Sequence, residues 1–186
     1  PLSQCSSLEP EELVDVARRR GLDGIVLSEH DAQWDEAALT ALRERTGFLV
    51  LGAVELTTDR GHILAFGLPA SSGPLPTLHA AARVAREHKA LLYLAHPARD
   101  GLLRVDHEIV TACASVEAVN GSDSRLQNIA SSGLAHGFPF PGVGGSDAHT
   151  AAEVGRAATR FATEIASAGE LLAALRSGNY EAVRLE

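Results

Sequence analysis

Histidines and carboxylates stand where short apolar runs of this sequence end. The runs GIVLSEHD (24–31), FLVLGAVE (48–55) and ALLYLAHP (90–97) present His30, Glu55 and His96, and HILAFGL (62–68) opens on His62. Parallel α/β folds carry their chemistry at the carboxyl ends of strands, so we expect these side chains to meet at one edge of a sheet. Two imidazoles and one carboxylate, from His62, His96 and Glu55, form a set that suits zinc, manganese or iron.

The most specific local signal is the pair Asp147 and His149 in GGSDAH (144–149). Side chains two positions apart on an extended segment point the same way, so both can reach one cluster. The glycines before them let the backbone come close to a bound group. A structural interpretation stays open, in which Asp147 caps a following helix and His149 is exposed.

Four further polar residues are candidates for holding a substrate: Arg99, Asn120, Ser146 and Arg156. Arg99 is the strongest of them, because a guanidinium can bind a phosphate through two hydrogen bonds. Each could equally be an ordinary surface or capping residue. The remaining histidines fall within or beside expected helices, and we interpret them as surface residues; they are His79, His88, His107 and His136.

Composition fits one globular domain, residues 1–186, with room for a substantial core, since 45% of the residues are hydrophobic. The net charge of −8 argues against general affinity for nucleic-acid backbones or anionic membranes. Two cysteines, Cys5 and Cys113, do not make a disulfide framework, and neither a signal peptide nor a membrane-spanning run is visible. We therefore expect a cytoplasmic protein.

Strand-like and helix-like segments alternate along the chain, as in parallel α/β folds. Helices are expected at 9–21, 35–47, 77–89, 124–137 and 169–178, strands at 24–28, 48–56, 62–68, 90–95 and 115–120, and a loop at 69–76. The spacings Thr150-x-x-Glu153 and Ser167-x-x-Glu170 match capping boxes, and the first of them predicts a short helix. The expected architecture is a (β/α) barrel, with a doubly wound open sheet as the competing one.

Several common catalytic signatures are absent from the sequence. It has no G-x-S-x-G elbow, no phosphate loop of the form G-x-x-x-x-G-K-[ST], and no dinucleotide-binding fingerprint. Serine hydrolysis, P-loop nucleotide hydrolysis and dinucleotide-dependent chemistry therefore find little support. Metal chemistry is the interpretation that the polar residues favour.

Five motifs in order resemble the PHP superfamily, named for polymerase and histidinol phosphatase, and especially its small metal-dependent phosphoesterases. The motifs are GLDGIVLSEHD, GAVELTTDRGHILAFGL, LAHPAR, EAVNG and GGSDAH. The resemblance implies a distorted (β/α)7-type barrel. It also implies two or three divalent metal ions, manganese, zinc or iron, bound at the carboxyl ends of the strands.

The same resemblance implies a role for each matched residue. His30 becomes a metal ligand, Glu55 bridges two metals, His62 and His96 join Glu55 on one metal, and Asp147 and His149 complete the other two. Glu55, Asp147 and Arg99 are then the catalytic group, and Arg99, Asn120 and Ser146 the substrate-binding group.

Three features depart from the family pattern. The opening H-x-H would lie upstream of Pro1, Ser3-Gln4-Cys5 stands where relatives often carry an aspartate ligand, and Glu29 replaces the aspartate of T-D-H. The sequence therefore predicts a domain that lacks its first strand here and begins earlier in the natural protein, because an unpaired strand edge inside a barrel is a liability.

The predicted activity is hydrolysis of phosphate esters by a hydroxide shared between the metal ions. Aromatic residues make up only 4% of the chain, which favours small substrates such as a nucleotide or sugar phosphate, with short oligonucleotide ends as a further option. Two alternatives stay open: a degenerate, non-catalytic PHP module that binds a ligand or partner, and an amidohydrolase-type metallohydrolase. The second usually needs a carboxylated lysine, and the single lysine, Lys89, lies at the end of an expected helix. The oligomeric state stays open.

Overall fold

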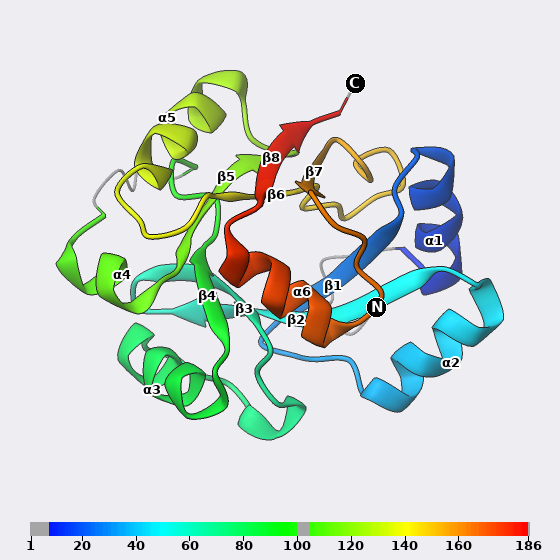
Figure 1. Cartoon of the computed structure of the whole chain (residues 1–186), viewed down its shortest axis with the longest axis horizontal. Coiled ribbons are helices and arrows are strands. Elements are labelled where there is room, and N and C mark those ends of the chain that lie inside the picture. The colour runs from blue at the N-terminus through cyan, green and yellow to red at the C-terminus, as the bar shows by residue number, and fades with distance from the viewer. Residues whose placement is uncertain (1–7, 100–104, 186) are drawn as a thin grey trace.

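The computed structural model of the chain describes residues 8–99 and 105–185, and Figure 1 shows how its elements are arranged. Its main sheet contains, in this order, β1 (Gly24–His30), β2 (Leu49–Thr58), β3 (Gly61–Phe66), β4 (Leu91–Leu94), β5 (Ser115–Asn120) and β6 (Val143–Gly145). Strands β7 (Ala157–Phe161) and β8 (Tyr180–Arg184) form a separate antiparallel pair. Ser3, Gln4 and Cys5 lie outside the described residues.

The six-stranded sheet curls into a half-barrel, so the fold is α/β and compatible with a distorted barrel (Figure 1). Sequential strand order also separates it from a doubly wound sheet, in which the order reverses at a switch point. The expectation of a parallel sheet is wrong at one strand. β3 runs antiparallel to both β2 and β4, because a tight turn at Asp59 and Arg60 joins β2 to β3 without a crossover helix.

Helices cover the sheet from both sides. They are α1 (Pro10–Arg19), α2 (Glu36–Thr46), α3 (Leu78–His88), α4 (His107–Ala112), α5 (Arg125–Ala135) and α6 (Ala168–Ser177), with a short 3-10 turn at Ala70–Ser72. The helix predicted after Thr150 does not form. Residues 151–155 are turns instead, and the Glu153 carboxylate accepts hydrogen bonds from the backbone N–H groups of His149 and Thr150, at 2.9 Å each.

Alternation along β2 separates the two faces of the sheet, because successive side chains of a strand point to opposite sides. Val50 packs with residues of α1 and α2, and Leu56 packs with residues of α3 and α4, on the outer face. Leu51 instead contacts the cluster that contains Leu171 and Leu175 of α6. Figure 1 shows α6 crossing this inner face. Glu55, four residues after Leu51, lies on the same inner face, beyond the part that α6 covers.

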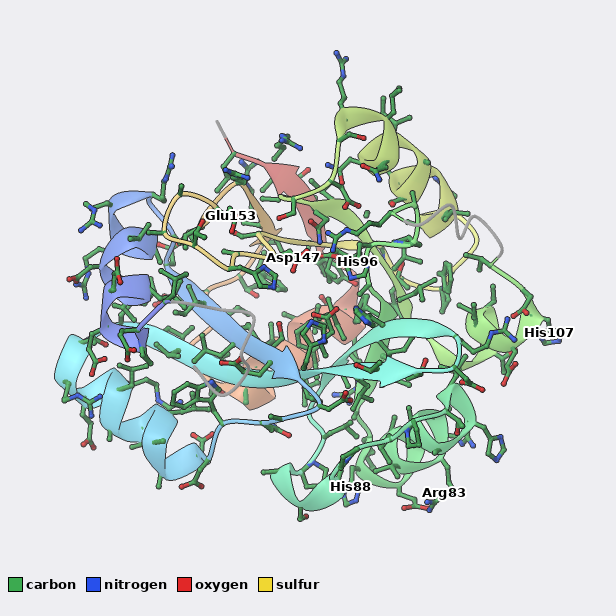
Figure 2. All side chains as sticks on the ribbon, turned by 180° about the vertical axis from the view of Figure 1, so that it is seen from behind. Arg83, His88, His96, His107, Asp147 and Glu153 are labelled. Atoms are coloured by element: carbon green, nitrogen blue, oxygen red, sulfur yellow. The ribbon has the colours of Figure 1, made fainter. Side chains whose placement is uncertain are left out.

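The exposed histidines agree with the sequence expectation. His79, His88, His107 and His136 are all exposed. Figure 2 shows His88 and His107 at the periphery, far from the central side chains. Within residues 8–99 and 105–185, none of the helices has both the length and the apolar character that crossing a bilayer requires.

Candidate metal centre and its arginine neighbour

Glu55 is the centre of a cluster of imidazoles. Its side chain is 9% exposed, and its Oε1 lies 2.9 Å from Nδ1 of His62 and 3.2 Å from Nε2 of His96. Oε2 lies 4.0 Å from Nε2 of His30. The structure therefore brings together four of the six predicted metal ligands.

Strand register explains how these residues meet. In the parallel pair of β1 and β2, His30 stands directly opposite Glu55. In the hairpin of β2 and β3, His62 stands opposite Thr57, which places it on the inner face two residues beyond Glu55. Glu55 is therefore inside β2, and the expectation that it closes the strand is wrong, because pairing with β3 extends β2 to Thr58.

His96 reaches the cluster through an unusual backbone conformation. It follows β4 with a φ of +28°, a backbone angle that residues other than glycine rarely adopt. Asp31 and Asp147 also have positive φ, at +49° each, and each lies within a few residues of a strand end. Such conformations persist where surrounding contacts fix them and tend to gather at functional sites. The backbone N–H of His96 is held by the Glu117 carboxylate, at 3.0 Å.

The charges of this cluster support one another. Burial alone would raise the pKa of Glu55, yet the hydrogen bond with His96 and the nearby His30, His96 and His62 lower it overall. Burial works against protonation of His96, but its hydrogen bond with Glu55 raises its pKa. The site therefore stabilises a carboxylate anion and attracts positive charge.

The donor set fits a divalent cation. Nδ1 of His62 is buried and makes no hydrogen bond with any described residue, although Oε1 of Glu55 is only 2.9 Å away. Ligand atoms of His30, Glu55 and His62 all lie within 4.8 Å of one another. A buried nitrogen lone pair beside a carboxylate suits metal coordination, and a set of imidazoles and a carboxylate suits zinc, manganese or iron.

Asp147 lies in a second cluster, in which an arginine is the cation. Its Oδ2 is 2.6 Å from Nη2 of Arg99 and accepts a longer hydrogen bond, 3.3 Å, from Nδ2 of Asn120. Arg99 also donates to Oδ1 of Asn120 at 2.9 Å and to Oδ1 of Asp123 at 2.7 Å. Burial works against the guanidinium charge, but the hydrogen bonds with Asp123 and Asp147 raise the pKa of Arg99.

The other two predicted residues of this region make mainly backbone contacts. Nδ1 of His149 lies 3.0 Å from the carbonyl oxygen of Asp147 and 3.9 Å from its carboxylate. The Ser146 hydroxyl donates to the carbonyl of Ala157 and accepts from the N–H of Gly155, so it fixes the β6–β7 loop. Metal binding by Asp147 and His149 and substrate binding by Asn120 and Ser146 stay predictions.

Glu117 links the two clusters, and the sequence motifs did not identify it as a site residue. Its Oε2 accepts from the backbone N–H of His96 and from Nδ2 of Asn120, which itself contacts Asp147. Figure 2 shows His96 and Asp147 together near the middle of the molecule. Burial raises the pKa of Glu117 to about 7. A Cβ on Gly145 would lie 2.8 Å from Oε1 of Glu117, so this glycine leaves the space that the carboxyl group occupies.

A second missed residue is Asp123, in the turn after β5. Its side chain is 1% exposed, and Oδ1 accepts the hydrogen bond from Nε of Arg99. The signal that could have identified Glu117 is an acid inside the apolar run SVEAVN (115–120). Asp123 gave no such signal, because the turn NGSDS in which it lies is polar throughout.

Comparison with known proteins identifies the fold. Residues 126–180 match the family described as PHP-associated. No curated protein matches the sequence. A two-domain protein of Bacteroides vulgatus, which contains a predicted PHP-like metal-dependent phosphoesterase, has a similar structure with a TM-score of 0.78 at 20% identity. The likeness covers 97% of this chain and 61% of that protein, so this chain spans less than two thirds of it.

Two further solved structures share the fold. A protein of Bifidobacterium adolescentis matches with a TM-score of 0.61 at 16% identity. The match covers 78% of this chain and 84% of that one, which carries the provisional name of a metal-dependent phosphoesterase. The lesion-specific endonuclease PfuEndoQ of Pyrococcus furiosus matches with a TM-score of 0.67 at 15% identity, over 97% of this chain and 55% of that one.

Proposed function

We propose that this chain is a member of the PHP superfamily and hydrolyses phosphate esters with the help of two or three divalent cations, manganese, zinc or iron. The supporting observation is the buried Glu55 carboxylate with three imidazoles around it, one of which has a buried Nδ1 without a hydrogen bond to any described residue. We expect this half-barrel to belong to a distorted (β/α)7-type barrel.

Each residue of the site has a distinct task in this proposal. His30, Glu55, His62 and His96 would hold cations on the inner face of the sheet, with Asp147 and His149 as further ligands. Cations bound there supply Lewis acidity and lower the pKa of water. Arg99 would contact the phosphoryl oxygens and stabilise the charge that develops on them. Glu117 would keep His96 in place through its backbone N–H, and Asn120 would orient Arg99 and Asp147.

The substrate we infer is small and phosphorylated, such as a nucleotide or sugar phosphate. The net charge of −8 disfavours a long polyanion, because such binding depends on neutralising many phosphates. The likeness in fold to a lesion-specific endonuclease keeps short oligonucleotide ends among the candidates. A cytoplasmic location also stays part of the proposal, on the grounds of the cysteine usage.

Turnover of p-nitrophenyl phosphate with added Mn²⁺ or Zn²⁺ tests the proposal. The wild-type chain should release p-nitrophenol, and Glu55→Ala and Asp147→Ala should each abolish the release. Glu181→Gln is a matched control, because Glu181 is an exposed acid whose partner, Arg160, lies on the separate β7–β8 pair. Full activity in Glu55→Ala would refute the proposal.

One observation favours the non-catalytic alternative. Arg99 already neutralises the charge of Asp147. In a site that binds fewer metal ions, an arginine in this place would take over the role of the missing ion. A non-catalytic module should retain at most one tightly bound ion per chain after dialysis, whereas the proposed enzyme should retain at least two. Elemental analysis of the dialysed protein separates the two functions.

A further inference from the structure

Asp123 is the more deeply buried of the two carboxylates that accept hydrogen bonds from Arg99. The Asp123 side chain is 1% exposed, against 14% for Asp147 and 30% for Arg99. Oδ1 of Asp123 accepts from Nε of Arg99 at 2.7 Å, while Oδ2 is buried and has no hydrogen bond among the described residues. Asp123 therefore cannot meet a substrate itself, and its side chain acts through Arg99.

Such a carboxylate is costly unless a cation compensates it. A buried charge is tolerated when it is paired, and removing its partner leaves an uncompensated charge. Asp147 is different, because it is more exposed and is also a proposed metal ligand. If Asp147 turns to a metal ion, Asp123 still balances the charge of Arg99 and holds it in place.

The hydrogen bonds of Arg99 leave one part of the guanidinium available. Nε bonds to Asp123, and Nη2 bonds to Asn120 and Asp147. Nη1 makes no hydrogen bond with any of the described residues. Two fixed nitrogens define the plane of the group, so Nη1 is held in one direction, and a planar guanidinium recognises phosphate oxygens by such a fixed geometry.

We propose that Asp123 is a positioning residue that orients Arg99 to bind the phosphoryl group of the substrate. This inference rests on the proposed function, because it concerns the same site. The ligand chemistry is a tetrahedral phosphate oxyanion, either the ester of a substrate or the inorganic phosphate released from it.

Binding of inorganic phosphate, measured by titration calorimetry, tests this role in four proteins: wild type, Asp123→Asn, Arg99→Lys and the double variant. The change from aspartate to asparagine keeps the size of the side chain and removes its charge. We expect Asp123→Asn to weaken phosphate binding about tenfold, because the acceptor of the Arg99 hydrogen bond loses its negative charge. The double variant should bind no more weakly than Arg99→Lys alone, because Asp123 acts only through Arg99.

Further readouts distinguish positioning from a structural role. In Asp123→Asn the KM for p-nitrophenyl phosphate should rise about tenfold, in step with the weaker phosphate binding, while bound metal per chain stays at the wild-type value. Glu181→Gln, the matched acid-to-amide change beside an exposed arginine, should leave phosphate binding unchanged. If Asp123→Asn does not fold, Asp123→Ser keeps a short acceptor and should give the same weakening.

The outcomes separate this inference from the proposed function. Additive losses in the double variant, unchanged phosphate binding in Asp123→Asn, or a parallel loss of metal would each overturn the role of Asp123. Phosphate binding that depends on Asp123 through Arg99, in a protein that hydrolyses no ester, would support the inference and refute the enzyme. A wild-type protein that hydrolyses the ester, together with unchanged phosphate binding in Asp123→Asn, would support the enzyme and refute the inference.

Discussion

Two carboxylates of this molecule, Glu55 and Asp147, face opposite kinds of partner. Glu55 is surrounded by three imidazoles, which lie 2.9, 3.2 and 4.0 Å from its oxygens. Asp147 instead lies 2.6 Å from the guanidinium of Arg99, which also binds Asp123. Imidazoles can release their protons and become ligands, whereas a guanidinium stays protonated and cannot coordinate a metal.

This difference indicates which of the two clusters, the one around Glu55 or the one around Asp147, binds a cation more tightly. An imidazole nitrogen that carries a proton can give it up to become a ligand, so a metal ion in the histidine cluster competes only with protons. At Asp147 a metal ion must compete with the charge of Arg99. We therefore expect a tight cation at Glu55 and a weaker one at Asp147, and the predictions below test this order.

The largest effect should come from Glu55 compared with Asp147. Glu55→Gln should weaken the tightest metal binding about a hundredfold or more, since Glu55 contacts all three histidines. Asp147→Asn should lower the number of bound ions and leave the tightest binding unchanged. Competition titrations against a chromogenic chelator measure both. Equal losses in the two variants would remove the distinction between the clusters.

A smaller effect should separate His62 from His149. His62→Ala removes an imidazole whose buried Nδ1 lies 2.9 Å from Oε1 of Glu55, and it should weaken binding of the tightest cation tenfold to about a hundredfold. His149→Ala removes a side chain that contacts mainly the backbone of Asp147, so it should not change that affinity. The same titrations decide it, and a larger loss in His149→Ala would contradict the order of binding.

Glu117 should give the metal-free protein a pH-dependent stability. Burial raises the pKa of Glu117 from 4.5 to about 7, so the folded state keeps a proton that the unfolded state has released. Between these values the free energy of unfolding should fall as pH rises, by roughly 1.4 kcal/mol for each pH unit. The loss begins above the unfolded value and levels off above about pH 7.

Urea denaturation of the metal-free protein at pH 5, 6 and 7 measures this slope. Glu117→Gln keeps an oxygen that can accept from His96 and Asn120, and it should flatten the slope because no carboxyl proton remains. An unchanged slope in this variant would assign the pH dependence to other groups.

The smallest effect belongs to the exposed histidines. His79→Ala, on the exposed side of α3, should change metal affinity by no measurable amount and the free energy of unfolding by less than about 0.5 kcal/mol. Calorimetry and denaturation of this variant serve as the baseline for His62→Ala. A clear loss of metal in His79→Ala would mean that the bound ion lies elsewhere.

The sequence predicted the site better where strands position the residues than where turns do. Apolar runs that end on His30 and His96 located two members of the histidine cluster, because alternation along a strand determines which face a side chain joins. Antiparallel pairing of β3 was not predicted, since an apolar run carries no sign of its direction. It nevertheless brings His62 beside Glu55.

The arginine cluster was predicted less well. The sequence marked Arg99 as a phosphate contact, and this stays a prediction, but it did not predict that Asp123, Asn120 and Asp147 hold the guanidinium. These contacts join residues 21, 24 and 48 positions apart in loops and strand ends, and no local pattern encodes such distances. The capping spacing of Thr150 and Glu153 predicted the hydrogen bond correctly but not the helix, because that carboxylate closes a turn instead.

The most direct test of the central claim is the position of a bound cation. Crystals of the chain grown with Mn²⁺ or Zn²⁺ and measured at the metal's absorption edge should show an anomalous peak among Glu55, His30, His62 and His96. This peak should be stronger than any peak beside Asp147. Anomalous density at Asp147 alone, with none at Glu55, would contradict the account.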